Sequence, residues 1–252
     1  MTGLTKKPIE FRVNAAIFDV DGTLIISQPA IAEMWRDFGK DKPYFDAEHV
    51  IAISHGWRTY DAIKAFAPEY ADEKFVAKLE GEIPVKFGDY AIQVPGAVDM
   101  CRSLNALPKQ KWAVGTSGTF EMASQWFKYL GIERPKVFIT ASDVENGKPN
   151  PEPYLKCRGG LGCLVNEMHP ERAKAVVFED APAGIKAAKG ARCKVCGIAT
   201  TFDLSALKDH GCDIIIKNFE SVRVGGYDPE TDEVIFIFDD YLYAKEDLLE
   251  WK

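Results

Sequence analysis

The chain has 252 residues, of which 46% are hydrophobic and 27% are charged, as is typical of a globular protein with a sizeable core. Its formal net charge of −7 gives no long-range attraction toward a phosphate backbone or an anionic lipid surface, so nucleic-acid and membrane partners are disfavoured. One domain with an insertion fits this length as well as two small domains would.

The N-terminal stretch MTGLTKKPIEFRVNAAIF lacks the apolar region of a signal peptide, and no segment is long enough to span a bilayer. The six cysteines are therefore expected to be reduced thiols in a cytoplasmic protein, which we also expect to be a monomer. Cys193 and Cys196 are three apart in CKVCGIAT, a predicted strand, so their side chains should point to opposite faces. This placement favours two core residues over a metal or redox pair.

The first buried strand is predicted by AAIFDV at 15–20, and it runs into the sequence DVDGT at 19–23. Asp19 and Asp21 are alternate residues where the strand enters a turn, so their carboxylates can converge. Such a pair suits covalent phosphoryl transfer, in which one carboxylate attacks phosphorus and the other protonates the departing alkoxide. A calcium loop of the EF-hand type also begins Asp-x-Asp, but here Gly22 follows at once and the loop's later ligands are missing.

Residues 27–92 interrupt the strand pattern with helical sequences such as PAIAEMWRDFG, TYDAIKAFA and DEKFVAKLEGEI. We interpret them as an inserted helical cap domain, with residues 1–26 and 93–252 forming an α/β catalytic core. The sequence VPG at 94–96 marks the return to the core, where AVDMCRSLNAL predicts a helix.

The second strand, KWAVGT at 111–116, ends at Thr116 and is followed by Ser117, Gly118 and a helical pattern. A hydroxyl and free N–H groups at a helix start can bind an anion, although simple helix capping explains the same residues. After a third strand at 136–140, Lys148 stands in NGKPNPEPYL, where the prolines keep the loop extended. Taken alone, Lys148 would count for little, because a surface lysine is usually solvated.

The fourth strand, AVVFED at 175–180, ends in the adjacent acids Glu179 and Asp180. They would repel each other and the other carboxylates unless a cation lies among them, and Mg²⁺ is the simplest choice because it takes oxygen ligands. Asp180 could instead cap the helix predicted by AGIKAAKGA. A further strand at 194–200 follows, and SVRVGGYDPETDEVIFIFDDYL predicts a C-terminal β-hairpin.

The alternation of buried strands with helices predicts an α/β fold with a doubly wound, mainly parallel, Rossmann-like sheet. Ligands of such sheets bind beyond the carboxyl ends of the strands. All four chemically distinctive sites fall at or near such ends.

The four sites, DVDGT, the Thr116 hydroxyl, Lys148 in the GKP loop and the acids of FEDAPAGIKAA, resemble the four motifs of the haloacid dehalogenase superfamily. The resemblance implies that Asp19 is the nucleophile and Asp21 the general acid/base, with Lys148 holding the phosphoryl group and compensating Asp19. An Asp at position 21 favours phosphate esters over dehalogenation, because a halide needs no proton. The residues assigned to phosphate binding are Gly22, Thr23, Thr116, Ser117 and Gly118.

The same resemblance implies that Mg²⁺ is held by the Asp19 carboxylate, the Asp21 backbone carbonyl and Asp180, with Glu179 nearby or acting through water. A cap is expected to cover the site and set specificity. In SHGWRTYDAI, His55 and Arg58 are the candidate contacts to substrate hydroxyls or phosphate, with structural roles on a helix surface as the alternative.

Over nearly its whole length the chain is similar to the fungal glycerol-phosphate phosphatases, for example in ISHGWRTYDAI, VFEDAPAGIKAAK and IATTFDL. It is slightly less similar to the fungal phosphatases of 2-deoxyglucose 6-phosphate. This resemblance implies a Mg²⁺-dependent phosphoric monoester hydrolase that forms glycerol, in glycerol biosynthesis and the osmotic stress response. A hexose phosphatase, a phosphomutase and a non-catalytic phosphate sensor remain as alternatives. The chain departs from related sequences at 25–27, where Ile-Ile-Ser replaces a common acidic residue.

Overall fold

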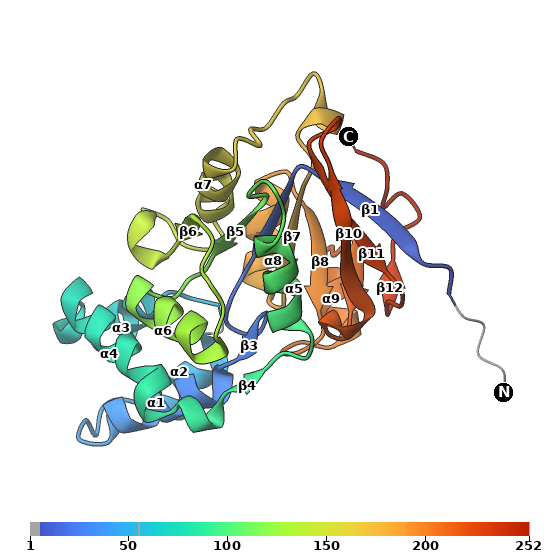
Figure 1. Cartoon of the computed structure of the whole chain (residues 1–252). Coiled ribbons are helices and arrows are strands. Elements are labelled where there is room, and N and C mark those ends of the chain that lie inside the picture. The colour runs from blue at the N-terminus through green and yellow to red at the C-terminus, as the bar shows by residue number, and fades with distance from the viewer. Residues whose placement is uncertain (1–5, 55, 252) are drawn as a thin grey trace, which may run out of the picture.

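The computed structural model describes residues 6–54 and 56–251. Its centre is a seven-stranded sheet in the order β12-β9-β8-β7-β2-β5-β6, parallel except for β12 (Figure 1). The uniformly apolar runs predict strands covered on both faces, and every residue of the three adjacent strands β7, β2 and β5 is buried. The strands are β2 (Ala15–Phe18), β5 (Trp112–Gly115), β6 (Val137–Ile139), β7 (Ala175–Glu179), β8 (Lys194–Ile198), β9 (Ile214–Ile216) and β12 (Tyr243–Ala244).

Helices cover both faces of this sheet, which confirms the doubly wound α/β class. On one face Phe18 stacks on Phe178, with ring centroids 4.4 Å apart, in a core that includes residues of α5 and α6. Ile17, the neighbour of Phe18 in β2, belongs to the opposite core with residues of α7, α8 and α9. The helices are α5 (Ala97–Asn105), α6 (Phe120–Leu130), α7 (Glu152–Gly160), α8 (Pro182–Gly190) and α9 (Leu204–Asp209).

The cysteines follow the same division between the two faces. Cys196 packs in the core that contains Phe18, whereas Cys193 packs in the core that contains Ile17. All six cysteines are buried as free thiols. The two neighbours in CKVCGIAT are therefore core residues on opposite sides of the sheet, as the strand period predicts.

A helical insertion between β3 (Ile25–Ile26) and β4 (Ile92–Gln93) lies at one end of the molecule, in the lower left of Figure 1. Asp46 and Asp72 cap two of its helices by accepting hydrogen bonds from the backbone of His49 and Phe75. The insertion is joined to the sheet through a two-stranded antiparallel ladder of β3 and β4, and α4 packs against α6. Its elements are α1 (Gln28–Gly39), α2 (Ala47–Ile53), α3 (Thr59–Phe66) and α4 (Glu73–Lys86), flanked by β3 (Ile25–Ile26) and β4 (Ile92–Gln93).

The predicted C-terminal hairpin is present as β10 (Val222–Asp228) and β11 (Glu233–Phe238), but it belongs to a three-stranded sheet. The third strand, β1 (Ile9–Val13), pairs with β11 and was not expected from the sequence. Phe236 of β11 lies 5.5 Å from Phe178 between ring centroids, so this small sheet packs on the main one. Among the described residues no helix is both long enough and apolar enough to cross a membrane.

Candidate active site

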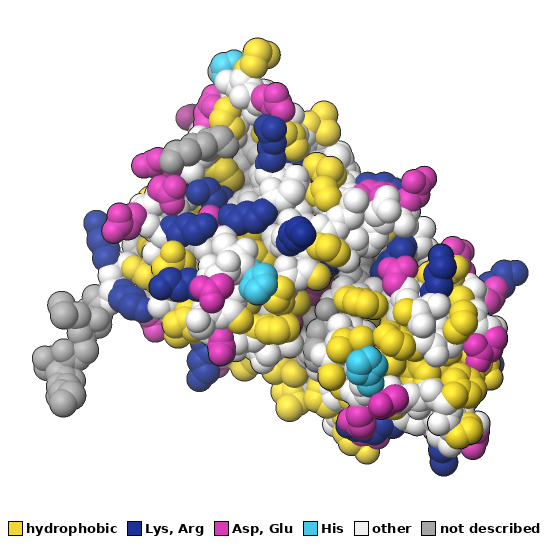
Figure 2. Space-filling model, turned by 180° about the vertical axis from the view of Figure 1, so that it is seen from behind, with side chains coloured by type: hydrophobic (Ala, Val, Ile, Leu, Met, Phe, Trp, Pro, Cys, Tyr) yellow, Lys and Arg dark blue, Asp and Glu magenta, His cyan; other side chains and the backbone are white. Residues whose placement is uncertain are grey.

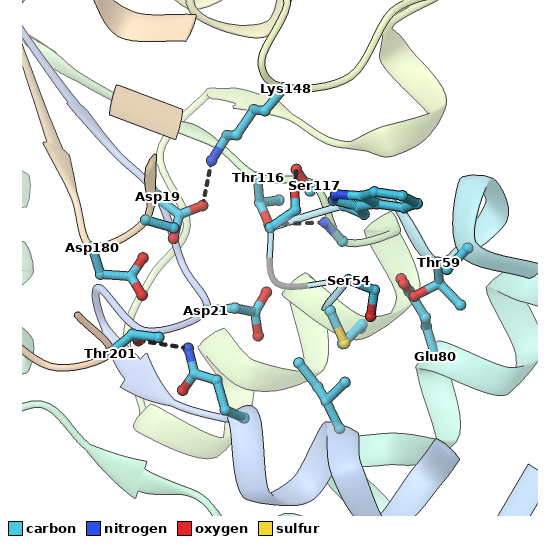
Figure 3. Close-up of a pocket in the computed structure, with 18 of the residues that line it drawn as sticks. Asp19, Asp21, Ser54, Thr59, Glu80, Thr116, Ser117, Lys148, Asp180 and Thr201 are labelled. Atoms are coloured by element: carbon cyan, nitrogen blue, oxygen red, sulfur yellow. Dashed lines mark hydrogen bonds and ion pairs between the residues drawn. The ribbon is translucent and has the colours of Figure 1, made fainter. Parts of the chain in front are cut away.

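A cavity lies where the carboxyl ends of β2, β5 and β7 face the helical insertion (Figure 3). Its empty volume is about 840 Å³, part of it open to solvent. Side chains from all four predicted sites line it, although they come from positions far apart in the chain: Asp19, Asp21, Thr116, Ser117, Gly118, Lys148, Glu179 and Asp180. In Figure 2, seen from behind, the insertion forms the smaller lobe at lower right.

Lys148 joins two of the buried carboxylates. Its Nζ lies 2.5 Å from Asp19 Oδ1 and 2.9 Å from Glu179 Oε1. Burial alone would lower the pKa of Lys148, but the charges of Asp19 and Glu179 raise it above its ordinary value. Burial raises the pKa of Asp19 to about 7 in spite of the attraction of Lys148. The ammonium group is thus a fixed positive charge at this end of the cavity.

Glu179 has partners at both carboxylate oxygens. Oε1 accepts hydrogen bonds from Lys148 and, at 3.0 Å, from the hydroxyl of Tyr154, while Oε2 accepts the Ala181 N–H at 2.7 Å. Gly184 of α8 comes so close that a Cβ there would lie 1.5 Å from Oε1. Glu179 is therefore held in place by protein groups. Tyr154, in the first turn of α7, was not selected from the sequence, because a tyrosine has no distinctive spacing to an acid 25 residues later.

Asp180 differs from Glu179, because its Oδ2 is buried without a hydrogen-bond partner. Burial raises the pKa of Asp180 well above its usual range, and the nearby Glu179 and Asp19 raise it further. Oxygens of Asp19, Glu179 and Asp180 lie within 4.8 Å of one another. Gly22, at φ +93°, leaves space beside them, since a Cβ there would lie 2.0 Å from Asp180 Oδ2. An unpaired oxygen among three carboxylates fits a bound metal ion.

The alternative role of Asp180 as a helix cap is not what the structure shows. The N-cap of α8 is Ala181, and no side chain caps this helix end.

Asp21 lines the same cavity, and Ser27 Oγ donates a hydrogen bond of 2.5 Å to its Oδ1. Burial raises the pKa of Asp21, and the hydrogen bond from Ser27 acts in the opposite direction. A raised pKa favours the protonated carboxyl that a general acid needs. Ser27 ends the Ile-Ile-Ser segment that departs from related sequences, but only the folded turn shows that its side chain returns to Asp21.

The loop between β5 and α6 contributes polar groups beside Asp21. Thr116 is buried, and its Oγ1 accepts the Gly118 N–H at 3.0 Å. Ser117 Oγ donates to the carbonyl of Gly56 in the insertion, also at 3.0 Å. The N-cap of α6 is Thr119, so Thr116 is left free of a capping role.

Three of the predicted residues are not in the lining of the cavity. Gly22 and Thr23 lie in the turn behind it, and the buried Thr23 Oγ1 has no hydrogen-bond partner. Arg58 pairs with Asp61, at 2.7 and 2.9 Å, and donates to the Val144 carbonyl at 3.3 Å, which ties the insertion to the core. A contact between Arg58 and substrate stays a prediction. His55 falls outside the described residues.

Glu80 of α4 is a buried lining residue that reasoning from the sequence missed. A signal for it exists, because Val76, Glu80 and Ile83 are the buried residues of this helix and share one face. A carboxylate within the apolar face of a helix is unusual and indicates a functional or structural role for that residue.

Comparison with known proteins places this site in a family. Residues 13–192 match the haloacid dehalogenase-like hydrolases. The chain is 71% identical over 249 residues to glycerol-1-phosphate phosphohydrolase 2 of Saccharomyces cerevisiae, covering 99% of this chain and 100% of that enzyme. It is 35% identical over 226 residues to 2-deoxyglucose-6-phosphate phosphatase 1 of the same yeast, covering 85% and 92% of the two chains.

Among solved structures, a hydrolase from Pseudomonas syringae has the same fold, with a TM-score of 0.65 at 23% identity over 81% of this chain and 93% of that one. The family match spans most of the sheet and all four sites around the cavity. This chain therefore belongs to the haloacid dehalogenase-like hydrolases.

Proposed function

We propose that this hydrolase is a Mg²⁺-dependent phosphatase that converts glycerol phosphate to glycerol and phosphate. The identity of 71% to a yeast enzyme named for glycerol 1-phosphate supports this substrate. The observation that carries the chemistry is that Asp19, Asp21, Lys148 and Asp180 line one cavity, with Lys148 Nζ 2.5 Å from Asp19 Oδ1.

In the first step an Asp19 oxygen attacks phosphorus, and the bond from phosphorus to the alcohol oxygen breaks. Lys148 holds a phosphoryl oxygen and balances charge, while Thr116, Ser117 and the backbone of the β5–α6 loop bind the remaining oxygens. Gly22 and Thr23 form the turn that lets the backbone approach the phosphoryl group. The product of this step is an aspartyl-phosphate at Asp19.

Asp21 gives its proton to the departing alkoxide, which leaves as the free alcohol. It then takes a proton from water as that water attacks the phosphorus, so that phosphate is released and the Asp19 carboxylate is restored. The upward shift in the pKa of Asp21 caused by burial supports the first role, and the hydrogen bond from Ser27 supports the second by stabilising the charged form.

Mg²⁺, when bound, supplies positive charge that offsets the buried carboxylates and the phosphoryl oxygens. We assign its binding to the carboxylates of Asp19 and Asp180 and to the backbone carbonyl of Asp21. The unpaired Asp180 Oδ2 supports a direct contact, whereas the hydrogen bonds from Lys148, Tyr154 and Ala181 that occupy Glu179 support a role for Glu179 through water.

We infer that residues 27–92 act as a cap domain on a catalytic core of 1–26 and 93–252. The contacts of Ser117 with Gly56 and of Arg58 with Val144 would hold the cap closed and keep bulk water away from the phosphoryl group. We propose that the enzyme acts in the cytoplasm, where its six cysteines would stay reduced. We further propose that it contributes to glycerol formation and to the osmotic stress response. We expect it to be a monomer, since one chain supplies all the groups named above.

The test is release of inorganic phosphate from glycerol 3-phosphate, glycerol 1-phosphate and 2-deoxyglucose 6-phosphate, with and without Mg²⁺. We expect the highest kcat/KM on a glycerol phosphate and activity only with the metal. A preference for the hexose ester would instead support a sugar phosphatase, the alternative favoured by the 35% identity. A requirement for a bisphosphate activator would indicate a phosphomutase.

A further inference from the structure

Glu80 of α4 is a buried carboxylate that the proposed phosphoryl chemistry does not use. Its side chain comes from the helical insertion and is only 2% exposed. Glu80 Oε2 accepts the backbone N–H of Thr119 at 2.5 Å, and the hydroxyls of Thr59 and Thr119 stabilise its charged form. Among the described residues no lysine or arginine forms an ion pair with it. Burial raises the pKa of Glu80 to about 7, as expected of a carboxyl without a counter-charge.

Glu80 shares its cavity with the proposed catalytic carboxylates (Figure 3). In that view Asp21 lies between Glu80 on one side and Asp19 with Asp180 on the other. The oxygen of the departing alcohol must come to Asp21, because Asp21 is the group that protonates it. The remainder of the alcohol then extends away from Asp19, into the part of the cavity where Glu80 and Thr59 lie.

The composition of this part of the cavity restricts what can bind. Ile31, Trp35, Ile83 and Met122 are apolar, and Ser54 and Thr59 carry uncharged hydroxyls. The one cation among the described lining residues is Lys148, which is already engaged by Asp19 and Glu179. In this cavity a second anionic group on the substrate would therefore meet the Glu80 carboxylate, which repels it. Arg58 and Lys64 line a second cavity that also borders Glu80, and Arg58 is already paired with Asp61.

We propose that Glu80 selects the alcohol portion of the substrate, accepting hydrogen bonds from its free hydroxyls and rejecting phosphate esters that carry a second anionic group. The inference rests on the proposed phosphatase function and adds a specificity rule to it. A carboxylate is a strong acceptor for hydroxyl donors. A substrate without such hydroxyls cannot form these additional hydrogen bonds to Glu80, which costs binding in the transition state.

The experiment compares three phosphate esters of similar size: glycerol 3-phosphate, 1-propyl phosphate and glycerate 3-phosphate. Values of kcat/KM are measured for the natural chain, for Glu80→Gln and for Glu82→Gln. Glu82 is the matched control, because it lies in the same helix but is partly exposed and pairs with Lys86. Circular dichroism and the thermal midpoint confirm that each variant is folded.

We expect the natural chain and Glu82→Gln to prefer glycerol 3-phosphate over the other two esters. In Glu80→Gln the ratio of kcat/KM for glycerate 3-phosphate to that for glycerol 3-phosphate should rise at least about tenfold. An equal loss on all three esters would overturn the proposal, because it would show that Glu80 only holds α4 against the start of α6.

Two further outcomes keep the hypotheses apart. If the natural chain releases no phosphate from glycerol 3-phosphate, the proposed function is wrong, regardless of the result for Glu80→Gln. If Glu80→Gln does not fold, the kcat/KM values of the natural chain on the three esters are the test. Equal values for glycerate 3-phosphate and glycerol 3-phosphate would overturn the specificity rule. A strong preference for glycerol 3-phosphate over both other esters would support it.

Discussion

Ser27 Oγ donates a 2.5 Å hydrogen bond to Asp21 Oδ1, so the residue that leads into α1 contacts the proposed general acid/base. Ser27 is fully buried, and a hydrogen bond from a hydroxyl to a carboxylate is strong in such surroundings. The start of the helical insertion and the catalytic turn are therefore coupled through one side chain.

Replacing Ser27 with Ala should lower kcat about tenfold, because Asp21 loses the donor that orients it and stabilises its charge. The hydrogen bond lowers the pKa of Asp21, so its loss should raise that pKa. The protonated acid would then persist to higher pH, and the alkaline limb of the kcat profile should move upward. The exposed Ser103→Ala change on α5 is the control. An unchanged pH profile in Ser27→Ala would show that Ser27 does not tune Asp21.

Substitutions of the two aspartates in the first motif should impair catalysis in different ways. Asp19→Asn should abolish turnover and leave no phosphoenzyme after acid quenching with labelled substrate, because the nucleophile is gone. Asp21→Asn should keep substrate binding but lower turnover about 10²- to 10⁴-fold, the usual contribution of a general acid. Labelled phosphate still trapped in Asp19→Asn would assign the nucleophile elsewhere.

Asp180→Asn should weaken the response to metal while keeping the fold. The change removes one of three clustered buried charges and an oxygen with no protein partner. We expect the Mg²⁺ concentration for half-maximal activity to rise at least about tenfold, and the rise in thermal midpoint on adding Mg²⁺ to shrink. The exposed Asp240→Asn change serves as the control. If Asp180→Asn responds to Mg²⁺ like the natural chain, Asp180 is not a metal ligand.

Glu80 should make stability fall as pH rises. Burial raises its pKa to about 7 from an ordinary value of 4.5, so the folded chain holds this proton more tightly than the unfolded chain does. The resulting stabilisation is complete below pH 4.5 and is lost as the pH passes 7. Relative to Glu80→Gln, the free energy of unfolding of the natural chain should decline by about 3 kcal/mol across that window. Urea unfolding of both chains at a series of pH values measures the difference, and parallel curves would contradict it.

The sheet and its carboxyl-end residues are predictable from the sequence, because buried parallel strands have a strong pattern. Uniformly apolar runs mark β2, β5 and β7, and the polar residues that follow them must meet at one edge. The pattern alone therefore predicts that Asp19, Thr116 and Glu179 lie close together. The third strand of the small sheet, β1, was missed because its partner β11 is more than 200 residues away.

The residues missed at the cavity depend on tertiary contacts rather than on local pattern. Ser27, Tyr154 and Glu80 reach Asp21, Glu179 and the Thr119 backbone from other elements. Arg58, chosen for its charge, instead pairs with Asp61 three residues along α3, a partner that helical spacing provides. A charged side chain in a sequence does not tell by itself whether it faces a ligand or a neighbour.

The ladder between β3 and β4 brings together the two places where the chain enters and leaves the helical insertion. A segment whose two ends are neighbours can be replaced by one of different length or shape without displacing the strands on either side. The helices between β3 and β4 can thus change in length and shape during evolution. Related enzymes can therefore differ in the alcohol portion of the substrate that they accept and still keep the same catalytic residues at the ends of the strands.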